Sequence, residues 1–509
     1  RLVEILAQKI RKQAHIRIIG DYDVDGVTSS HLFLTALRRV GAKVDVVIPH
    51  RIQDGYGLSL HLLQQAKEDG VDTILTCDNG IAAIDEIAWA KAQKMTVLVT
   101  DHHAVPFEEH EGRRTEKKSL ADAVVNPHQQ DCRYPYKELC GAGVAWNVIR
   151  VLYENYDMDK REAEDLLDFV AMATVCDVMS LTGENRILVK EGLKRIRHTK
   201  NIGLQALMQA CNVQPENISA YHFGYVLGPC VNATGRLDTA RHALRLFETG
   251  QETEAEEIAR DLVDLNQERK ELTLQGVEMA KKLCEEGGYE NDPVLVLFLP
   301  DVHESIAGLI AGRIREMYNR PVFVLTRGEE GVKGSGRSTE NYSMYENMCG
   351  CAELFTKFGG HPMAAGLSLP EENVEKFRRK INENCPLTVE EVCPDIHIDM
   401  AMPVGYASTE LVHQFALLEP FGKDNPSPLF ADRNLSISRM WVIGKNRNVL
   451  RMSVLSEYGQ PVPVIFFGDV ETLFAYFTEK FGQEEVENAL HGRKNRILFS
   501  MVYTAKKIG

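Results

Sequence analysis

Residues 20–26 read Gly-Asp-Tyr-Asp-Val-Asp-Gly and follow directly on the apolar run at 15–19. The carboxylates of Asp21, Asp23 and Asp25 therefore fall at alternate positions, at the tip of what the apolar run predicts to be a buried strand. Like charges packed this closely repel one another, and burial makes the repulsion worse. The feature restricts the fold to one in which cations can meet this strand end.

The first hundred residues alternate short apolar runs with amphipathic stretches. Strand-like runs cover 15–19, 43–48, 73–76 and 95–100, and helix-like stretches cover 28–40, 60–68 and 83–93. Thr28, Ser29 and Ser30 have side chains of the type that caps a helix, and we expect them to begin the first one. Alternating strands and helices predict an α/β fold with a parallel sheet and helices on both of its faces.

The rest of the chain divides by composition. The charged, Pro-free stretch at 251–286 predicts one long helix, which Gly287 and Gly288 end. A second α/β unit follows, and the last part has short β-rich runs typical of a small barrel or sandwich. We expect four segments: a first α/β domain at 1–250, a connecting helix at 251–289, a second α/β domain at 290–390 and a β-rich domain at 391–509.

Composition limits the class of protein. The chain has 509 residues, enough for two to four domains, and its 44% hydrophobic and 26% charged residues are ordinary for a globular protein. No apolar run approaches the ~18 residues of a membrane helix, and the charged N-terminal residues do not resemble a signal peptide. We therefore expect a cytoplasmic protein without a membrane segment. Because the sequence begins at Arg1 rather than Met, we also expect it to lack its natural N-terminus.

Cysteine usage and net charge limit which ligands and partners the chain is expected to bind. The 11 cysteines show no CxxC spacing, and Cys349 and Cys351 form only a CxC pair, which is weak evidence for zinc. Free thiols in a reducing compartment explain this pattern better than disulfides do. The net charge of -15 argues against general binding to nucleic acid, but it leaves room for local basic grooves and bound cations.

Acids and imidazoles recur after three further elements. They are Asp78 after the run at 73–76, Asp101, His102 and His103 after the run at 95–100, and Asp177 after the helix-like stretch at 169–176. Ligands of an open parallel sheet bind outside the carboxyl ends of its strands, so these side chains can meet at one point. Carboxylate and imidazole ligands suit Mn²⁺ or Mg²⁺ better than a structural Zn²⁺. Because the ligands outnumber the needs of one ion, we expect two, a pairing that suits phosphoryl displacement.

Each motif alone also has a simpler reading. Asn79-Gly80 is common in turns, a His pair is more often a surface or capping feature, and Asp177 could bond to backbone at a helix end. The occurrence of the motifs in strand order favours a metal site. Cys77 and Cys176 each precede a proposed ligand, and because neighbouring side chains of a strand face opposite ways, we interpret both as packing residues.

Taken together, these motifs resemble those of the DHH phosphoesterase family. Three later stretches extend the resemblance: Asn232-Ala-Thr-Gly-Arg-Leu237 to the family's N-A-x-G-R-L element, and Gly334-Ser-Gly-Arg-Ser338 and Phe358-Gly-Gly-His-Pro362 to its DHHA1 domain. Pro420-Phe-Gly-x-x-Asn-Pro426 opens a segment similar to the OB-fold barrel of RecJ-type members, which combine all three parts in this order. The resemblance implies a single-stranded-DNA-specific exonuclease of DNA repair and recombination. Such an enzyme releases 5′-mononucleotides in the 5′-to-3′ direction by two-metal-ion hydrolysis.

The resemblance also implies roles for single residues. The positions that match the family's metal ligands are Asp23, Asp25, Asp78, His102 and Asp177, with Asp78 and Asp177 as candidates to bridge two Mn²⁺ or Mg²⁺ ions. The candidate catalytic residues are His103 near the scissile phosphate, Asp101 as its orienter, and His361 from the second lobe. Asp21 is a supporting residue in this scheme.

Four further positions match residues that bind substrate. They are Arg51, Ser335 and Arg337 for a terminal 5′ phosphate, and Arg236 for substrate phosphates. Arginine offers a planar fork of donors that fits phosphate oxygens, and Gly334 and Gly336 would let backbone N–H groups approach an anion. The simpler readings are tight turns for the two glycine motifs and a structural ion pair for Arg236.

The C-terminal segment would hold the incoming strand, since OB-folds bind single strands through basic grooves and aromatic platforms. The candidates are Arg439, Trp441, Lys445, Arg447, Arg451 and the run 491–496, although Trp441 could be core and the run a solvated loop. The resemblance implies single-stranded DNA as substrate and a single-strand-binding protein and a RecQ-type helicase as partners, and we expect a monomer. The alternatives are a DHH/DHHA1 phosphodiesterase of short oligonucleotides or cyclic dinucleotides, and a non-catalytic scaffold.

Overall fold

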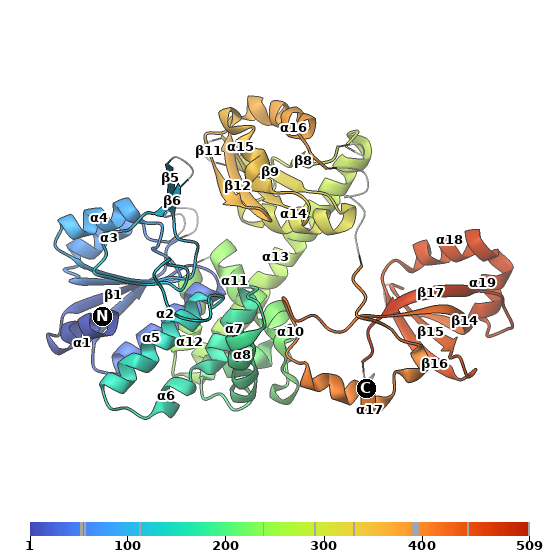
Figure 1. The fold of residues 1–509 in the computed structure, drawn as a ribbon, viewed down its shortest axis with the longest axis horizontal. Coiled ribbons are helices and arrows are strands. Elements are labelled where there is room, and N and C mark those ends of the chain that lie inside the picture. Colours follow the sequence, from blue (N-terminus) through green and yellow to red (C-terminus); the bar gives the residue numbers. More distant parts are fainter. Residues whose placement is uncertain are drawn as a thin grey trace. The chain divides into compact units, whose positions relative to one another are not determined.

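The computed structural model of the chain describes residues 1–50, 54, 57–110, 113–237, 239–289, 292–328, 331–387, 396–444 and 447–506. The chain forms two compact units, the first made of 1–394 with 422–424 and the second of 395–421 with 425–509 (Figure 1). Among the helices of the described residues, none combines the length and the hydropathy that crossing a membrane requires.

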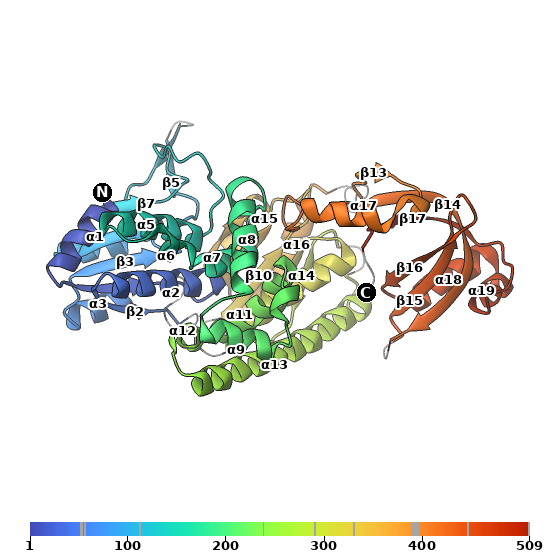
Figure 2. The same ribbon diagram turned by 90° about the horizontal axis from the view of Figure 1, so that it is seen from below.

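The first sheet lies in the N-terminal part of the first unit and is parallel throughout. Its strands run in the order β2 (Lys43–Val47), β1 (His15–Ile19), β3 (Thr73–Cys77), β4 (Thr96–Thr100) and β7 (Ala123–Val125). One face packs on α1 (Leu2–Arg11), α2 (Val24–Arg39) and α5 (Gly141–Asn155), and the other on α3 (Leu60–Glu68) and α4 (Ile84–Ala92) (Figures 1 and 2). The predicted parallel sheet with two helical layers is confirmed.

Helix α2 begins four residues earlier than its sequence pattern predicted. Its N-cap is Asp23, whose carboxylate accepts a hydrogen bond from the Gly26 N–H at 3.0 Å. Thr28, which we expected near the cap, is buried inside the helix and donates its hydroxyl proton to the Val24 carbonyl at 2.6 Å. The predicted caps at Thr28, Ser29 and Ser30 are therefore wrong, because an aspartate at the strand end caps equally well. One of the three clustered acids thus also fixes the start of a helix.

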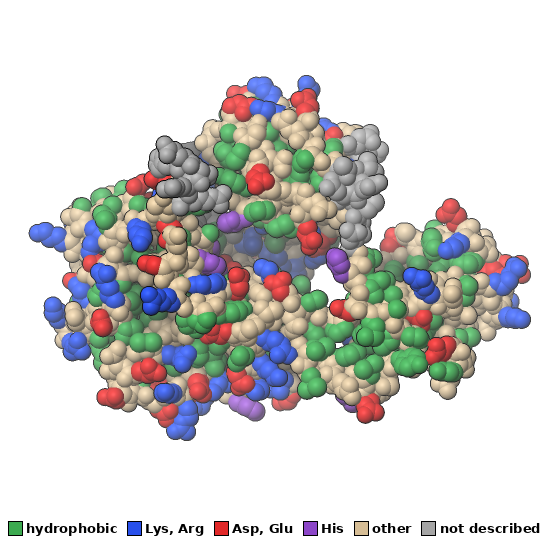
Figure 3. Space-filling model, viewed as in Figure 1, with side chains coloured by type: hydrophobic (Ala, Val, Ile, Leu, Met, Phe, Trp, Pro, Cys, Tyr) green, Lys and Arg blue, Asp and Glu red, His purple; other side chains and the backbone are tan. Residues whose placement is uncertain are grey.

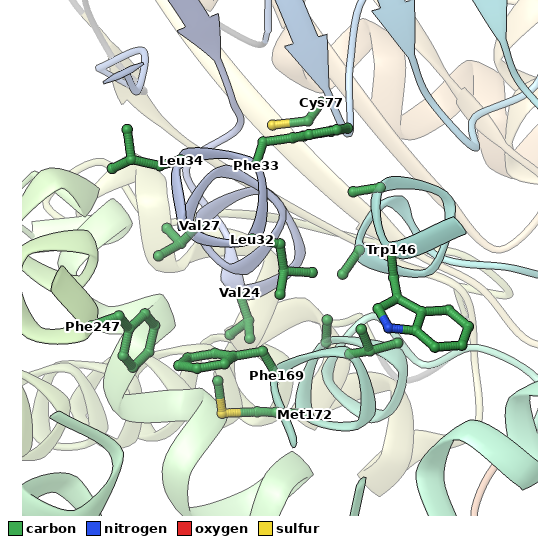
Figure 4. Packing of buried hydrophobic residues seen from close by; sticks show 14 of the residues in the cluster. Val24, Val27, Leu32, Phe33, Leu34, Cys77, Trp146, Phe169, Met172 and Phe247 are labelled. Carbon is green, nitrogen blue, oxygen red and sulfur yellow. The ribbon is translucent and has the colours of Figure 1, made fainter. Parts of the chain in front are cut away.

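The core of the first unit surrounds α2. Buried side chains of α2, α5, α7 (Leu167–Cys176) and α12 (Ala240–Glu248) meet in Figure 4, among them Val24, Val27, Leu32, Phe33, Trp146, Phe169, Met172 and Phe247. Burying a side chain of this size stabilises the fold by about 1.5–3 kcal/mol. The loop that carries the three acids is therefore anchored to the most deeply packed helix of the unit.

Helices fill the middle of the chain. They are α6 (Lys160–Glu164), α8 (Gly183–Ile196), α9 (Ile202–Ala210), α10 (Ala220–His222), the π-helical turn η2 (Phe223–Leu227), α11 (Gly228–Leu237) and the 35-residue α13 (Glu252–Glu286). Helix α13 ends at Gly287, which agrees with the long helix predicted there.

The second sheet follows α13 and is mixed. Its order is β11 (Lys357–His361), β12 (Ala364–Leu369), β10 (Gly331–Arg337), β9 (Val322–Gly328) and β8 (Leu295–Phe298), with only β8 and β9 parallel. Helices α13 and α14 (Glu304–Tyr318) cover one face, and α15 (Met344–Cys349) and α16 (Val374–Glu383) cover the other. The two glycine motifs, for which turns were the simpler reading, are strands.

The second unit is a curled sheet with two helices against it. Its strands are β13 (Met400–Ala401), β14 (Phe430–Ile443), β15 (Val449–Leu455), β16 (Pro461–Phe467) and β17 (Leu498–Tyr503), and its helices are α17 (Thr409–Gln414), α18 (Val470–Phe481) and α19 (Gln483–Leu490). Strand β14 pairs with both β15 and β17, and a register shift in each pairing bends it. Helices α18 and α19 pack on this sheet and complete its core.

Candidate metal centre

Asp25 lies at the start of α2 and is held by a distant helix. Its side chain is buried, and its two oxygens accept the N–H groups of Gly141 at 2.5 Å and Ala142 at 2.7 Å, at the first turn of α5. A helix N-terminus favours a carboxylate because its N–H groups are unpaired and its dipole is positive there. A Cβ on Gly141 would lie 2.7 Å from the Asp78 Cβ, so only glycine allows both acids to come this close.

Asp78 follows β3 in an unusual backbone conformation. Its φ is +62°, in the left-handed region that a residue with a Cβ adopts at some cost. The next residue fixes this turn, since the Asn79 amide donates to the carbonyls of Ile19 at 3.0 Å and Cys77 at 2.9 Å. Asn79 therefore ties the end of β3 to the end of β1 and turns the Asp78 carboxylate towards the other acids.

His102 marks the point where the elements converge. Its Nε2 lies 3.0 Å from Asp78 Oδ1, 3.6 Å from Asp177 Oδ2 and 3.7 Å from Asp25 Oδ2, so three loops and a helix end meet there. The imidazole is buried, yet among the described residues this nitrogen has no hydrogen-bond partner of acceptable geometry. A buried ring nitrogen surrounded by carboxylates, without a hydrogen bond of its own, fits a metal ligand.

Asp101 organises the His-His pair rather than joining the cluster itself. One oxygen accepts the backbone N–H groups of His102 and His103 and the His103 Nδ1 at 2.8 Å, and the other accepts the Ile81 N–H. The Asn126 side chain holds the His103 carbonyl at 2.9 Å. This network fixes both rings and agrees with the orienting role expected for Asp101.

The carboxylates of the cluster are unfavourable to ionise together in the metal-free protein. Burial and the neighbouring carboxylates, Asp25 first, raise the pKa of Asp78 and of Asp177 well above the ordinary value, and raise that of Asp23. Burial lowers the pKa of His102. Burial also lowers the pKa of His103, but its hydrogen bond to Asp101 and that carboxylate's charge outweigh this effect and raise the pKa to about 9. A divalent cation would neutralise the crowded carboxylates and so favour their ionised form.

The donor set fits divalent cations. Three groups of side chains each place one ligand atom per residue within 4.8 Å of one another, and they share members: Asp78 with His102 and His103, Asp25 with His102 and Asp177, and Asp21 with Asp23 and Asp78. The donors are carboxylate oxygens and imidazole nitrogens, which suit Mn²⁺ or Mg²⁺. Neither neighbouring cysteine joins them, because the Cys77 thiol packs against Ser30 and the Cys176 thiol donates to the Phe223 carbonyl at 3.3 Å.

Helix α11 supports the acidic loop from outside. The Asn232 carboxamide oxygen accepts the Val24 N–H at 3.1 Å, between two of the clustered acids. A Cβ on Gly235 would collide with the Tyr22 carbonyl, so this contact requires glycine at that position of the N-A-x-G-R-L element. Arg236 donates from Nη1 to the Ser305 carbonyl at 2.6 Å and thereby joins α11 to α14. Asn232 and Gly235 shape the loop, and Arg236 makes a structural contact in addition to any role towards phosphate.

A cavity of about 410 Å³ lies beside the acidic loop. Its lining includes Tyr22 from that loop, Ser335 and Lys333 from β10, and Lys357 and Phe358 from β11. Figure 3 shows a hollow on this face of the first unit, with Lys and Arg side chains at its back and His side chains beside it. Tyr22 was not among the residues that the sequence singled out, although it stands between two of the acids.

The remaining candidates of the second sheet lie apart from the metal-binding groups. Arg337 lies against Gly308 of α14 and donates from Nη1 to the Gly336 carbonyl at 2.8 Å. His361 is exposed at the end of β11 and belongs to none of the three metal-binding groups formed by the described residues. Arg51 and Lys445 lie outside the described residues.

The expected anion cradle at Gly334 and Gly336 is wrong. Strand β10 pairs with β9 on one side and β12 on the other, so the sheet uses its backbone N–H groups. A Cβ on Gly334 would collide with the Leu325 side chain, and one on Gly336 would meet Met344 and Phe323. The glycines leave room for core side chains, and Ser335 and Arg337 face the opposite way.

An aromatic and basic surface of the second unit centres on Trp441. Trp441 is half-buried on β14, and the guanidinium groups of Arg439 and Arg451 lie 5.2 and 5.7 Å from its ring centre. Cation–π contacts of this kind hold an aromatic ring in place at a surface. Within the run 491–496, Arg496 pairs with Glu485 at 2.8 Å and the Asn495 amide donates to the Ile437 carbonyl, so these two residues are structural.

Several residues of the centre escaped sequence reasoning. The amides of Gly141 and Ala142 lie more than a hundred positions from Asp25, and nothing in the local sequence links the two segments. The glycine-rich start of an apolar helix, Gly-Ala-Gly at 141–143, is the one available signal. Asn79 was interpreted only as a turn residue, whereas its side chain locks two strands together.

Comparison with known proteins agrees with this arrangement. Family models match at residues 15–174 for the DHH family N-terminal domain, 291–385 for the DHHA1 domain and 398–504 for the RecJ OB domain. The single-stranded-DNA-specific exonuclease RecJ of Haemophilus influenzae is 35% identical over 90% of this chain and 81% of that protein. The chain belongs to the RecJ family. The DHH, DHHA1 and OB-fold parts predicted from the sequence are confirmed, in the predicted order.

Two further RecJ proteins show how much of the family's length is covered. The Bacillus subtilis RecJ is 33% identical over 89% of this chain, which spans only 56% of that relative. A crystal structure of Thermus thermophilus RecJ in complex with Mn²⁺ has a TM-score of 0.75 and 28% identity and covers 92% of this chain and 68% of its own. The same protein with Mg²⁺ gives a TM-score of 0.71.

Proposed function

We propose that this chain is a metal-dependent exonuclease that hydrolyses single-stranded DNA from its 5′ end and releases 5′-mononucleotides, in DNA repair and recombination. The observation that carries the proposal is the convergence of three carboxylates on the buried Nε2 of His102, within 3.0–3.7 Å. The relatives named above as single-stranded-DNA-specific exonucleases support the substrate class.

Five residues would hold the metal ions. They are Asp23, Asp25, Asp78, His102 and Asp177, with Asp78 and Asp177 as the candidates to bridge two ions and Asp21 in support. Two Mn²⁺ or Mg²⁺ ions, when bound, would neutralise these carboxylates and stabilise the charge that develops on the phosphate during displacement. Binding of Mn²⁺ and Mg²⁺ by the Thermus thermophilus relative supports this choice of metal.

The protein's own residues would orient the substrate. With a pKa of about 9, His103 carries a positive charge at neutral pH in the metal-free protein, at the partly exposed rim of the cluster. Its hydrogen bond to Asp101 fixes the ring, so an imidazole N–H could donate to an oxygen of the scissile phosphate. His361 and Arg236 would bind further phosphates, and Ser335, Arg337 and Arg51 would hold the terminal 5′ phosphate and so set the direction of cleavage.

Each of the four segments would have its own role in binding or cleavage. We propose that 1–250 carries the reaction, 251–289 connects, 290–390 binds the 5′ end and 391–509 holds the incoming strand. The Trp441 ring between Arg439 and Arg451 supports the last assignment, since a base can stack on such a ring. We further propose a cytoplasmic monomer that works with a single-strand-binding protein and a RecQ-type helicase.

An assay of product size and direction tests the function. A 30-nucleotide single strand labelled at either end is incubated with Mn²⁺, and we expect mononucleotides from the 5′ end and slow cleavage of the same sequence as a duplex. A dinucleotide serves as the competing substrate. Faster turnover of the dinucleotide than of the long strand would favour a phosphodiesterase of short oligonucleotides instead.

A surface substitution tests the C-terminal assignment. Trp441→Ala should weaken binding to a long single strand by about 5- to 150-fold, since a stacked base contributes about 1–3 kcal/mol. Tyr458→Ala is the control, because that ring is exposed in the same unit at a β-turn away from the Trp441 surface. Equal affinity of the parent and Trp441→Ala proteins for the long strand, in a filter or anisotropy titration, would remove the stacking role.

A further inference from the structure

Two cysteines meet behind the acidic cluster. Cys211 ends helix α9 and Cys230 lies in helix α11, and their sulfur atoms are 3.8 Å apart. A disulfide bond is about 2.05 Å long, so closing it would move the sulfurs together by less than 2 Å. Both cysteines are reduced in the structure.

The two thiols have different surroundings. Cys230 is buried, accepts the Asn266 amide at 3.4 Å, and lies 3.2 Å from the Val226 carbonyl. Its thiol proton can therefore go either to that carbonyl or to Cys211. Cys211 is partly exposed, which gives a small oxidant access to one sulfur of the pair.

The surroundings also assign the reactive partner. The hydrogen bond from Cys230 lowers the pKa of Cys211, and the charge of Lys270 adds to this effect while partial burial opposes it. The neighbouring Cys211 and burial raise the pKa of Cys230. Because the partly exposed Cys211 is the sulfur that a peroxide can reach and the thiolate is the nucleophile, Cys211 attacks first and the buried Cys230 resolves.

Helix α11 links this pair to the acids. Two residues beyond Cys230, Asn232 accepts the Val24 N–H between Asp23 and Asp25, and Gly235 packs against the Tyr22 carbonyl. Because Asn232 lies on the same helix as Cys230, a change in α11 when the disulfide closes would disturb its hydrogen bond to that N–H. We propose that Cys211 and Cys230 form an oxidation site for hydroperoxides, whose closure to a disulfide loosens the loop that carries Asp23 and Asp25.

The chemistry balances in two steps. The Cys211 thiolate attacks one oxygen of hydrogen peroxide, the O–O bond breaks, and Cys211 becomes a sulfenic acid as hydroxide leaves. The Cys230 sulfur then attacks the Cys211 sulfur, the S–O bond breaks, and the disulfide forms as water leaves with the thiol proton. The two thiols lose two electrons in total and the peroxide gains them. A cytoplasmic reductant restores the dithiol, as expected for a transient disulfide in a reducing compartment.

The thiols nearest the acidic residues compete poorly with this pair, and the exposed Cys349 has only the buried Cys351 near it in sequence. Burial raises the pKa of Cys77, Cys140 and Cys176, which makes them poor nucleophiles. Cys132 is partly exposed, like Cys211, but the described residues bring no second thiol to it. Cys132 is therefore the matched control for oxidation.

The test uses the full chain with a small excess of hydrogen peroxide. Peptide mapping after alkylation should recover a Cys211–Cys230 cross-linked pair that has lost two hydrogen atoms and that dithiothreitol reverses. The pair should form in the parent and in Cys132→Ser, and be absent from Cys211→Ser and Cys230→Ser. Oxidation of other cysteines before this pair closes would overturn the oxidation site.

Hydrogen exchange tests the link to the acidic loop without any measurement of activity. In the oxidised parent, amides at residues 23–26 should exchange at least about threefold faster than in the reduced parent, since the Val24 amide loses its partner. The Cys211→Ser protein treated with peroxide should show no change, which separates the disulfide from other oxidative damage. A disulfide that forms with unchanged exchange at 23–26 would overturn the proposed loosening.

Discussion

The two sheets of the first unit present their candidate residues in different ways. In the parallel sheet, the candidates follow the ends of β1, β3 and β4, and their side chains converge on one buried nitrogen. In the mixed sheet, Ser335 and Arg337 lie within the central strand β10, and His361 lies at the end of the edge strand β11.

The difference follows from strand direction. Parallel strands bring their carboxyl ends to one edge, so residues far apart in sequence can surround a point, which a small cation requires. Neighbouring residues of an antiparallel strand alternate between faces, so Lys333, Ser335 and Arg337 form a row on the face of β10 towards α14, where Lys333 pairs with Glu304 at 2.8 Å. A row of donors suits an extended phosphate chain. Under the proposed function, the first sheet would hold metal and the second would bind substrate, and the following substitutions can break that division.

The largest effect is expected at the first sheet. Asp78→Asn keeps the size of the side chain but removes one candidate bridging carboxylate, and we expect hydrolysis to fall by roughly 10³-fold or more. The metal-free protein should unfold at the same temperature or higher, because a buried acid with a raised pKa costs stability when ionised. Turnover of the labelled single strand and thermal melting with and without Mn²⁺ are measured together.

Asp85→Asn is the control for charge. Asp85 is exposed in the first turn of α4, so the substitution changes the net charge equally without touching the cluster. Hydrolysis by Asp78→Asn at a rate close to the control's would remove the metal role from the end of β3.

The first sheet could be predicted closely because its pattern is periodic. Apolar runs at regular spacing predicted four of its five strands and their parallel order, and the acids after them predicted a metal centre. The short strand β7, Ala123–Val125, was missed, because three residues show no clear alternation. The start of α2 could not be predicted, because Asp23, Thr28 and Ser29 are all able to cap a helix and only packing selects among them. The hydrogen bond from the Gly141 N–H to the Asp25 carboxylate could not be predicted either, since it joins segments 116 residues apart.

The second sheet was predicted less well, for a physical reason. Glycine is depleted in strands, so Gly-Ser-Gly-Arg-Ser reads as a turn in the sequence. In the structure, the Leu325 and Phe323 side chains of the neighbouring strand occupy the space that Cβ atoms at Gly334 and Gly336 would need. Such a requirement depends on packing across strands, and the sequence near the glycines carries no sign of it.

The next effect is on stability at that position. Gly334→Val should lower the free energy of unfolding by about 1–3 kcal/mol, because its side chain must displace Leu325 and Leu367. Mn²⁺ affinity should stay at the parent's value. Urea unfolding and calorimetric Mn²⁺ titration measure the two quantities. Gly359→Val on β11 is the control, since a Cβ there meets nothing within 4 Å; an equal loss in both variants would contradict the packing explanation.

A smaller effect is expected from the row on β10. Arg337→Ala should slow cleavage of a 5′-phosphorylated strand by about 10- to 150-fold while leaving a 5′-hydroxyl strand unchanged, since a charged hydrogen bond contributes about 1.5–3 kcal/mol. Arg327→Ala is the control, because that arginine of the adjacent strand pairs with Glu371 at 2.9 Å. If the parent protein cleaves the 5′-phosphorylated and the 5′-hydroxyl strands at equal rates, this row does not bind the 5′ phosphate. The second sheet would then lack its proposed role.

The smallest effect is the pH dependence of the metal-free protein. Folding raises the pKa of Asp23, Asp78 and Asp177, chiefly through burial, so the folded state binds more protons than the unfolded state above the ordinary pKa of an aspartate. His103, with its pKa raised to about 9, acts in the same direction up to that pH. Stability from these groups is therefore present at low pH and falls as pH rises.

Thermal melting from pH 6.5 to pH 9 in the presence of a chelator measures this slope, and we expect the unfolding temperature to fall by a few degrees. Saturating Mn²⁺ should remove most of the decrease, because the carboxylates would then stay ionised at every pH of the series. In Asp78→Asn the decrease should be smaller, whereas Gly334→Val, with its defect in the second sheet, should keep the parent's slope at a lower temperature. If neither Mn²⁺ nor Asp78→Asn changes this slope, the pH dependence arises outside the acidic cluster. The buried carboxylates of the first sheet would then not account for the pH dependence of stability, and the contrast with the uncharged packing face at Gly334 would fail.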